Sequence, residues 1–237
     1  MMYTTARKQE KSWLPNRSLF LQIDRAETLL PKGTNPYSEA VYKTASETLN
    51  RMIDEGSFSS GQRTLLLLIR AYNERKNTTG LVGCASIDDY CNNVILKHEN
   101  TLEAKEQDRI RHIDACSAQT GPIFLAYRAD KKLGEIIKNV RLTPEVYDFT
   151  SDDGIRHEVW RIDKMSTIVD ISKIFEAIPH LYIADGHHRA ASAVKSELKR
   201  RAEDLPFFRN RRIQFIFFLS SSPRTNWRST TTIELLR

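Results

Sequence analysis

The residues best suited to chemistry stand together where an apolar run meets an alanine-rich helical pattern. In chain order they are Asp185, Gly186, His187, His188 and Arg189. A glycine allows a tight turn, and the N–H groups of a helix start attract anions. Imidazole and guanidinium groups at that point would hold a phosphate by charge-assisted hydrogen bonds. We therefore expect the glycine, both histidines and the arginine to bind phosphate, and Asp185 to orient a histidine or hold a magnesium ion carried with the ligand.

A capped helix with surface histidines is the simpler interpretation of the same turn. A lone histidine would favour that interpretation, whereas four polar residues around one glycine, directly after an apolar strand, favour a binding site. A zinc ion held by the protein is not expected, because adjacent histidines seldom ligate one ion together and no cysteine pair is near. The sequence thus predicts an anion site without a resident metal.

A second polar group follows a short predicted strand, Val94–Leu96. Glu99 is the candidate general base, and His98 is its neighbour in the expected site. In the helix predicted to follow, the side chains at i, i+3, i+4 and i+7 share one face and are Lys105, Asp108, Arg109 and His112. A solvated helix face crossed by ion pairs explains this spacing equally well.

Strands and helices intermix along the chain, which predicts a mixed α/β or α+β protein. The predicted helices are Glu39–Glu55, Thr101–Ala115, Val169–Ala177 and Ala190–Ala202. The predicted strands are Leu65–Ile69, Gly80–Ile87, Pro122–Tyr127, His157–Asp163, Leu181–Ala184 and Ile213–Leu219. Asn100 and Glu103 form a capping box for the second helix. Trp160 and Tyr182 are expected in the core.

The composition excludes several classes of protein. The chain has 237 residues, of which 40% are hydrophobic, so a packed core is feasible. A net charge of +6 from 36 basic and 30 acidic residues is weaker than the field of a dedicated nucleic-acid binder. No apolar run has bilayer-spanning length, so a membrane partner is not expected. Three cysteines, an odd number, indicate reduced thiols in the cytoplasm.

Three motifs carry a resemblance to a known family. They are Asp24-Arg-Ala-Glu27 with Asn35-Pro36-Tyr37, then Lys97-His-Glu-x-Thr with Lys105-Glu-x-Asp-Arg109 and Gly121-Pro122, and finally Tyr182-Ile-Ala-Asp-Gly-His-His-Arg-Ala-Ala191. In these stretches the chain resembles the domain of unknown function 1015 family over most of residues 18–219. The resemblance implies one incomplete domain over 18–219, preceded by a poorly ordered segment, 1–17. It also implies that Lys105, Asp108 and Arg109 complete the site at the glycine turn.

The Asp-Gly-x-His-Arg core is also similar to the phosphate motif of the ParB/sulfiredoxin superfamily. That similarity implies a ParB/sulfiredoxin-like mixed sheet with flanking helices, and a bound nucleotide (ATP, ADP or CTP) with Mg²⁺. His187 stands where sulfiredoxin has its reactive cysteine, so sulfinic-acid reduction is not expected. The leading interpretation is a nucleotide-dependent phosphotransferase, or a nucleotide hydrolase, acting on a small molecule. The alternatives are a nucleotide-switched binding module with or without DNA contact, and an inactive truncated relic.

Both ends of the chain depart from the family pattern. Relatives begin with some tens of additional residues that this chain lacks. The tail, residues 220–237, has no clear periodicity and does not match the family's segment, whereas a two-base shift permits a reading that does. We therefore expect a chain shortened at both ends, with its tail read out of frame.

Overall fold

The computed structural model describes residues 20–58, 66–74, 77–203 and 217–220, and the chain forms two compact units. The helical unit holds residues 20–58 and 102–121, and the sheet unit holds the other described residues. No helix within these ranges is long and apolar enough to cross a membrane. The expectations for the segments 1–17 and 220–237 lie outside the described residues, except for Ser220, which ends a strand.

The helical unit is built around one amphipathic helix. Its elements are α2 (Leu21–Asp24), the 3-10 helix η1 (Ala26–Leu29), α3 (Glu39–Asp54) and α5 (Glu103–Cys116). Buried side chains recur along α3 at helical spacing, and Leu49 and Met52 pack with Ile23 of α2. The predicted helix Glu39–Glu55 is thereby confirmed. The predicted capping box is wrong, because Leu102 precedes α5 and provides no side-chain cap.

The first sheet of the sheet unit is entirely antiparallel. Its strand order is β2-β1-β6-β5, with bounds β1 Leu66–Tyr72, β2 Asn77–Val82, β5 Tyr147–Thr150 and β6 Arg156–Ile162. Trp160 is buried on β6, as expected, and its indole Nε1–H donates a hydrogen bond to the carbonyl of Thr143 at 3.1 Å. The donor is thus satisfied inside the core.

The second sheet is mixed and carries the predicted phosphate turn. Its order is β3-β7-β4-β8, with bounds β3 Ile95–Leu96, β4 Ile123–Ala126, β7 Leu181–Asp185 and β8 Phe217–Ser220. β3 runs parallel to β7, whereas β4 runs antiparallel to β7 and parallel to β8. Ile123, Leu125 and Ile183 are buried here. With two sheets and their helices, the structure confirms the mixed α+β class.

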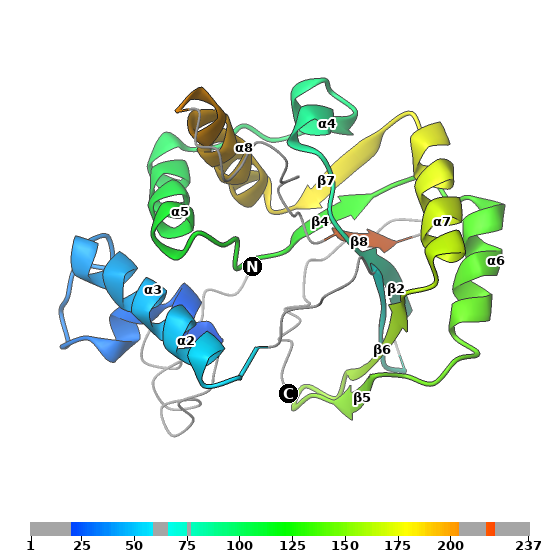
Figure 1. The fold of residues 1–237 in the computed structure, drawn as a ribbon, viewed down its shortest axis with the longest axis horizontal. Helices are drawn as coiled ribbons and strands as arrows, with labels where there is room; N and C mark the ends of the chain where they lie inside the picture. Colours follow the sequence, from blue (N-terminus) through cyan, green and yellow to red (C-terminus); the bar gives the residue numbers. More distant parts are fainter. Residues whose placement is uncertain (1–19, 59–65, 75–76, 204–216, 221–237) are drawn as a thin grey trace. The chain divides into compact units, whose positions relative to one another are not determined.

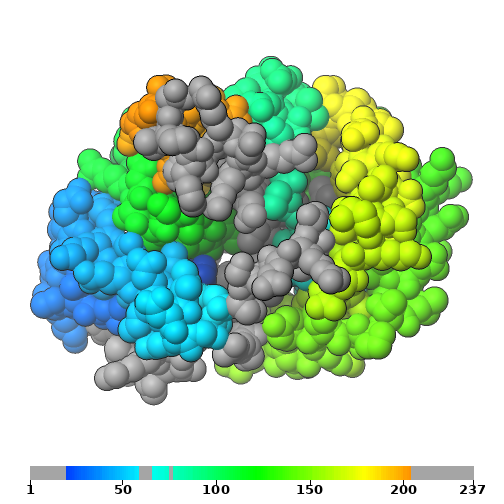
Figure 2. Space-filling view, viewed as in Figure 1, coloured from blue at the N-terminus to red at the C-terminus, as the bar shows by residue number. Residues whose placement is uncertain are grey.

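Helices flank these sheets. They are α4 (Ile87–Cys91), α6 (Lys131–Val140), α7 (Met165–Ala177) and α8 (His187–Ala202). α6 and α7 lie side by side at the surface, drawn in yellow-green and yellow (Figure 1, Figure 2). Asp130 caps α6, because its carboxylate accepts the N–H of Leu133 at 2.9 Å.

Several predicted elements have the wrong bounds, and β1 continues to Tyr72 rather than ending at Ile69. β2 ends at Val82 rather than at Ile87, which instead opens α4 behind the cap of Ser86. The hydroxyl of Ser86 accepts the N–H of Asp88 at 3.1 Å, so the side chain stops the strand pattern and begins a helix. α7 and α8 begin several residues earlier than their apolar patterns indicate.

The prediction that Tyr182 lies in the core is wrong. The residue is 41% exposed, although its neighbour Ile183 is buried. Successive side chains of a strand point to opposite faces, so β7 turns Ile183 toward the core and Tyr182 away from it.

A buried histidine on β6 predicts that stability depends on pH. Burial lowers the pKa of His157, whose ring stacks on Phe149 at 5.0 Å between centroids. The unfolded chain therefore binds this proton more readily, and the contribution of His157 to stability is present above the unfolded value of 6.5 and is lost as the pH falls below it. We expect a lower melting temperature at pH 5.5 than at pH 7.5, and a smaller difference in His157→Phe. An unchanged difference in that variant would contradict the assignment.

Candidate functional site

The glycine turn joins β7 directly to α8. Gly186 stands at the N-cap of α8 with φ = +90°, a left-handed conformation that glycine adopts without strain. A Cβ at this position would lie 3.5 Å from the Cα of Ile123 and 3.3 Å from Nε of Arg189. A side chain here would therefore be strained by its backbone conformation and would lie tightly against the arginine.

Parallel strand pairing brings a distant segment to this turn. β3 and β7 align Ile95 with Leu181 and Leu96 with Tyr182, so both strands end at the same edge of the sheet. His98 and Glu99 follow β3 after one intervening residue, Lys97, and Gly186 and His187 follow β7 directly. Side chains beyond the carboxyl ends of neighbouring parallel strands converge, which is where open α/β sheets bind ligands.

His98, Glu99 and His187 lie in contact. Nδ1 of His187 is 3.4 Å from Oε2 of Glu99. The rings of His98 and His187 meet edge to face, with 4.4 Å between their centroids. The structure thus brings His98 and Glu99 to His187 of the glycine turn, and their role in a joint site stays a prediction.

His187 is buried at the start of α8. It is 5% exposed, and its Nε2 has no hydrogen-bond partner among the described residues. Burial lowers its pKa, the neighbouring His98 lowers it further, and Glu99 and Asp185 act in the opposite direction. His187 is therefore neutral at pH 7, and Glu99 favours the tautomer that places the proton on Nδ1. A buried polar atom without a partner is costly, and such atoms are concentrated at functional sites.

The cationic part of the turn is Arg189, in the first turn of α8. Its Nη2 lies 3.2 Å from Oδ2 of Asp185, and about one third of its side chain is exposed. His188, the next candidate, is partly exposed, and its backbone carbonyl accepts a hydrogen bond from the hydroxyl of Ser192 at 2.7 Å. Because the side chain of Arg189 is partly exposed, its guanidinium can meet a ligand at the positive end of the α8 dipole, where an anion is favoured.

α4 braces both segments of the site. Nη1 of Arg201, near the end of α8, donates to Oδ1 of Asp88 at 2.7 Å. On the β3 side, Nζ of Lys97 lies 4.3 Å from the centre of the Tyr90 ring. These contacts hold the residue before His98 and the far end of α8 against one short helix.

The remaining candidates belong to the helical unit. Lys105, Asp108 and Arg109 lie on α5, where Oδ1 of Asp108 accepts the hydroxyl of Tyr42 at 2.8 Å and burial raises the pKa of Tyr42 to about 12. His112, on the same face, is buried with Nε2 3.0 Å from the carbonyl oxygen of Ile23. Asp108 and His112 thus connect elements within this unit, and the role of Lys105, Asp108 and Arg109 at the turn stays a prediction.

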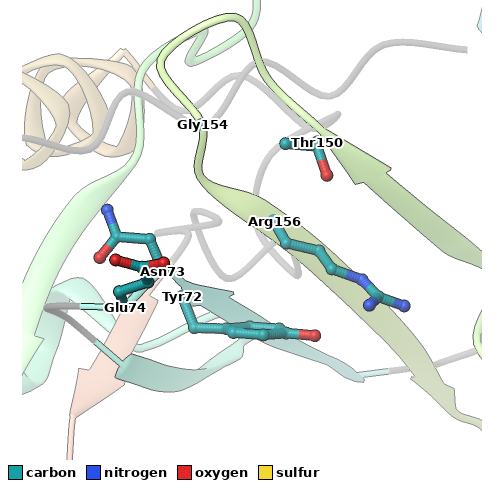
Figure 3. Close-up of a pocket in the computed structure, with 6 residues that line it drawn as sticks. All are labelled: Tyr72, Asn73, Glu74, Thr150, Gly154 and Arg156. Atoms are coloured by element: carbon teal, nitrogen blue, oxygen red, sulfur yellow. The ribbon is translucent and has the colours of Figure 1, made fainter.

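A cavity of about 670 Å³ lies elsewhere in the sheet unit, at the ends of β1 and β5 (Figure 3). It is lined by Tyr72, Asn73, Glu74, Thr150, Gly154 and Arg156. Two of its polar side chains already have partners, since Arg156 donates to both carboxylate oxygens of Asp148 and the hydroxyl of Tyr72 donates to Glu158. The glycine turn is the stronger candidate site, because its chemical groups converge with an unpartnered buried nitrogen.

Metal-ligating side chains form no cluster in the described part of the chain, the glycine turn included. No group of three or more histidine, cysteine, aspartate or glutamate side chains there could hold a metal ion. A magnesium ion at the turn would therefore take part of its ligands from phosphate oxygens, as Mg²⁺ does in many nucleotide sites.

Fold and site together define a mixed α+β protein with a candidate anion site at a strand–glycine–helix junction. The chain belongs to the protein family of unknown function DUF1015, whose model matches residues 3–222. No curated protein and no solved structure matches the chain significantly.

Proposed function

We propose that the chain binds a nucleotide through its phosphates at the start of α8 and transfers the terminal phosphoryl group to a small-molecule acceptor. The observation that supports this proposal best is the convergence of His98, Glu99 and His187 at the glycine turn. A helix start with an accessible guanidinium supplies phosphate binding, and an accessible carboxylate beside it supplies a proton acceptor. The similarity of the Asp-Gly-His-His-Arg turn to the ParB/sulfiredoxin superfamily favours a nucleotide, with ATP, ADP and CTP as candidates, as the source of the phosphates.

In this proposal His187 serves both groups. Its Nδ1 lies 3.4 Å from Oε2 of Glu99, and Nε2 would gain a proton and donate to a phosphate oxygen. A bound anion favours the protonated imidazole, so it opposes the effect of burial on the pKa of His187. His187 thereby connects the phosphate with the carboxylate that accepts the acceptor's proton.

Glu99 is the proposed general base because its side chain is 65% exposed and can meet an acceptor. The hydroxyl proton of the acceptor passes to Glu99, and the acceptor oxygen forms a bond to the terminal phosphorus. The bond from that phosphorus to the bridging oxygen breaks, and the shortened nucleotide leaves with the electron pair. Arg189 and the start of α8 stabilise the charge on the phosphoryl oxygens. Asp185 is proposed to orient Arg189. Its carboxylate would also be a ligand, together with phosphate oxygens, of the Mg²⁺ that accompanies the nucleotide.

The proposal is tested by melting the purified chain with ATP, ADP or CTP in the presence of Mg²⁺, and then by assaying nucleotide consumption with candidate acceptors. At a concentration 100 times its Kd, a nucleotide should raise the free energy of unfolding by about 2.7 kcal/mol. Nucleotide-dependent stabilisation with turnover supports the phosphotransferase, and stabilisation without turnover supports the nucleotide-switched binding module. No stabilisation by any of the three would overturn the proposal.

A further inference from the structure

Tyr182 is an exposed aromatic residue on an interior strand of the second sheet. β7 has β3 on one side and β4 on the other, yet Tyr182 remains 41% exposed. Phenolic side chains in the interior of a sheet usually pack against another layer. Because Tyr182 is exposed instead, its ring is available to a ligand.

The neighbours of Tyr182 leave space beside its ring. Across the sheet it aligns with Leu96 on β3 and with Ala126 on β4. Along β7, the next residue on the same face is Ala184. Two of these three side chains are single methyl groups, so the surface around the ring is shallow and apolar.

The same strand leads from this ring to the phosphate turn. Tyr182 precedes Gly186 by four positions, about 13 Å at the usual rise of about 3.3 Å per residue. A nucleotide spans such a separation between its terminal phosphate and its base. His98, two residues after Leu96, would share the side of Leu96 and Tyr182 if the extended course of β3 continues.

We infer that Tyr182 is the stacking platform for the base of the nucleotide whose phosphates lie at Gly186–Arg189. This inference rests on the proposed function and adds a subsite to it. Stacking on a flat ring does not depend on the hydrogen-bonding edge of the base, because every base has a π-face. The subsite therefore accepts purine and pyrimidine nucleotides alike and binds them more tightly than a bare polyphosphate.

The test compares ATP, CTP and inorganic tripolyphosphate, each with Mg²⁺, on the full chain and three variants. We expect the parent to bind both nucleotides about tenfold more tightly than tripolyphosphate. Tyr182→Leu should remove this difference without changing the Kd for tripolyphosphate, and Tyr182→Phe should keep it. The matched control is Tyr147→Leu, on the edge strand β5, where the side chain is 44% exposed.

The outcomes separate this inference from the proposed function. If Tyr182→Leu keeps the parental preference for nucleotides, or weakens tripolyphosphate binding to the same extent, the base subsite is overturned while the phosphate site stands. If the parent binds neither nucleotides nor tripolyphosphate, both proposals fail. Melting temperatures in the absence of ligand show whether each variant is folded.

Discussion

Glu99→Gln is expected to lower the turnover of nucleotide and acceptor by about 10²- to 10⁴-fold, the usual contribution of a general base. The amide has the size of the carboxylate, and its oxygen can occupy the place of Oε2, which lies 3.4 Å from Nδ1 of His187 in the parent. It cannot take a proton from the acceptor. The Kd for nucleotide should therefore stay close to that of the parent, which separates chemistry from binding.

The effect of Glu99→Gln is measured as kcat under saturating nucleotide, with the Kd determined in parallel. Glu176→Gln, an identical change at an exposed position near the end of α7, provides the control and should retain parental kcat. If Glu99→Gln turns over at the parental rate, Glu99 is not the base.

Arg189→Ala is expected to weaken nucleotide binding by about 10- to 150-fold, which corresponds to the loss of one charge-assisted hydrogen bond of roughly 1.5–3 kcal/mol. At a nucleotide concentration 100 times the parental Kd, stabilisation should fall from about 2.7 kcal/mol to roughly 0.3–1.4 kcal/mol. The fold should survive, because the side chain is partly exposed and its ion pair with Asp185, four residues earlier in the chain, is local and partly solvated.

Thermal melting with and without nucleotide measures the effect of Arg189→Ala. Arg51→Ala is the matched control, since Arg51 also forms an ion pair four residues along its helix, with Glu55 at 2.8 Å. Equal nucleotide stabilisation in Arg189→Ala and in the parent would refute the phosphate site.

Local patterns in the sequence predict the elements that pack by themselves. The helical spacing of Val41, Ala45, Leu49 and Met52 predicts α3, and the alternation around Trp160 predicts β6. Where a polar side chain decides the boundary, periodicity fails. Ser86 caps α4 within a run that reads as a strand. The capping pattern fails as well at α5, because the apolar Leu102, and not Asn100, is its N-cap.

The site shows a similar division. The glycine turn is contiguous, so residue type alone predicts it. The contact of Glu99 and His98 with His187 depends on the pairing of β3 with β7. The sequence of neither strand shows which strand it pairs with. The exposed position of Tyr182 could not be predicted, because an aromatic residue inside a strand fits a buried and an exposed face equally well. Only the register of β7 with β3 and β4 decides between them.

β3 contains two residues and forms an edge of its sheet, yet it is the segment that carries His98 and Glu99 to the turn. Short edge strands open locally at a far lower free energy than the core of a protein. Each opening would detach one half of the site and leave the glycine turn intact on β7. If ligand binding requires both halves, affinity and the closing equilibrium of this strand are thermodynamically linked. Substitutions at the buried Ile95 would then tune affinity without touching a ligand.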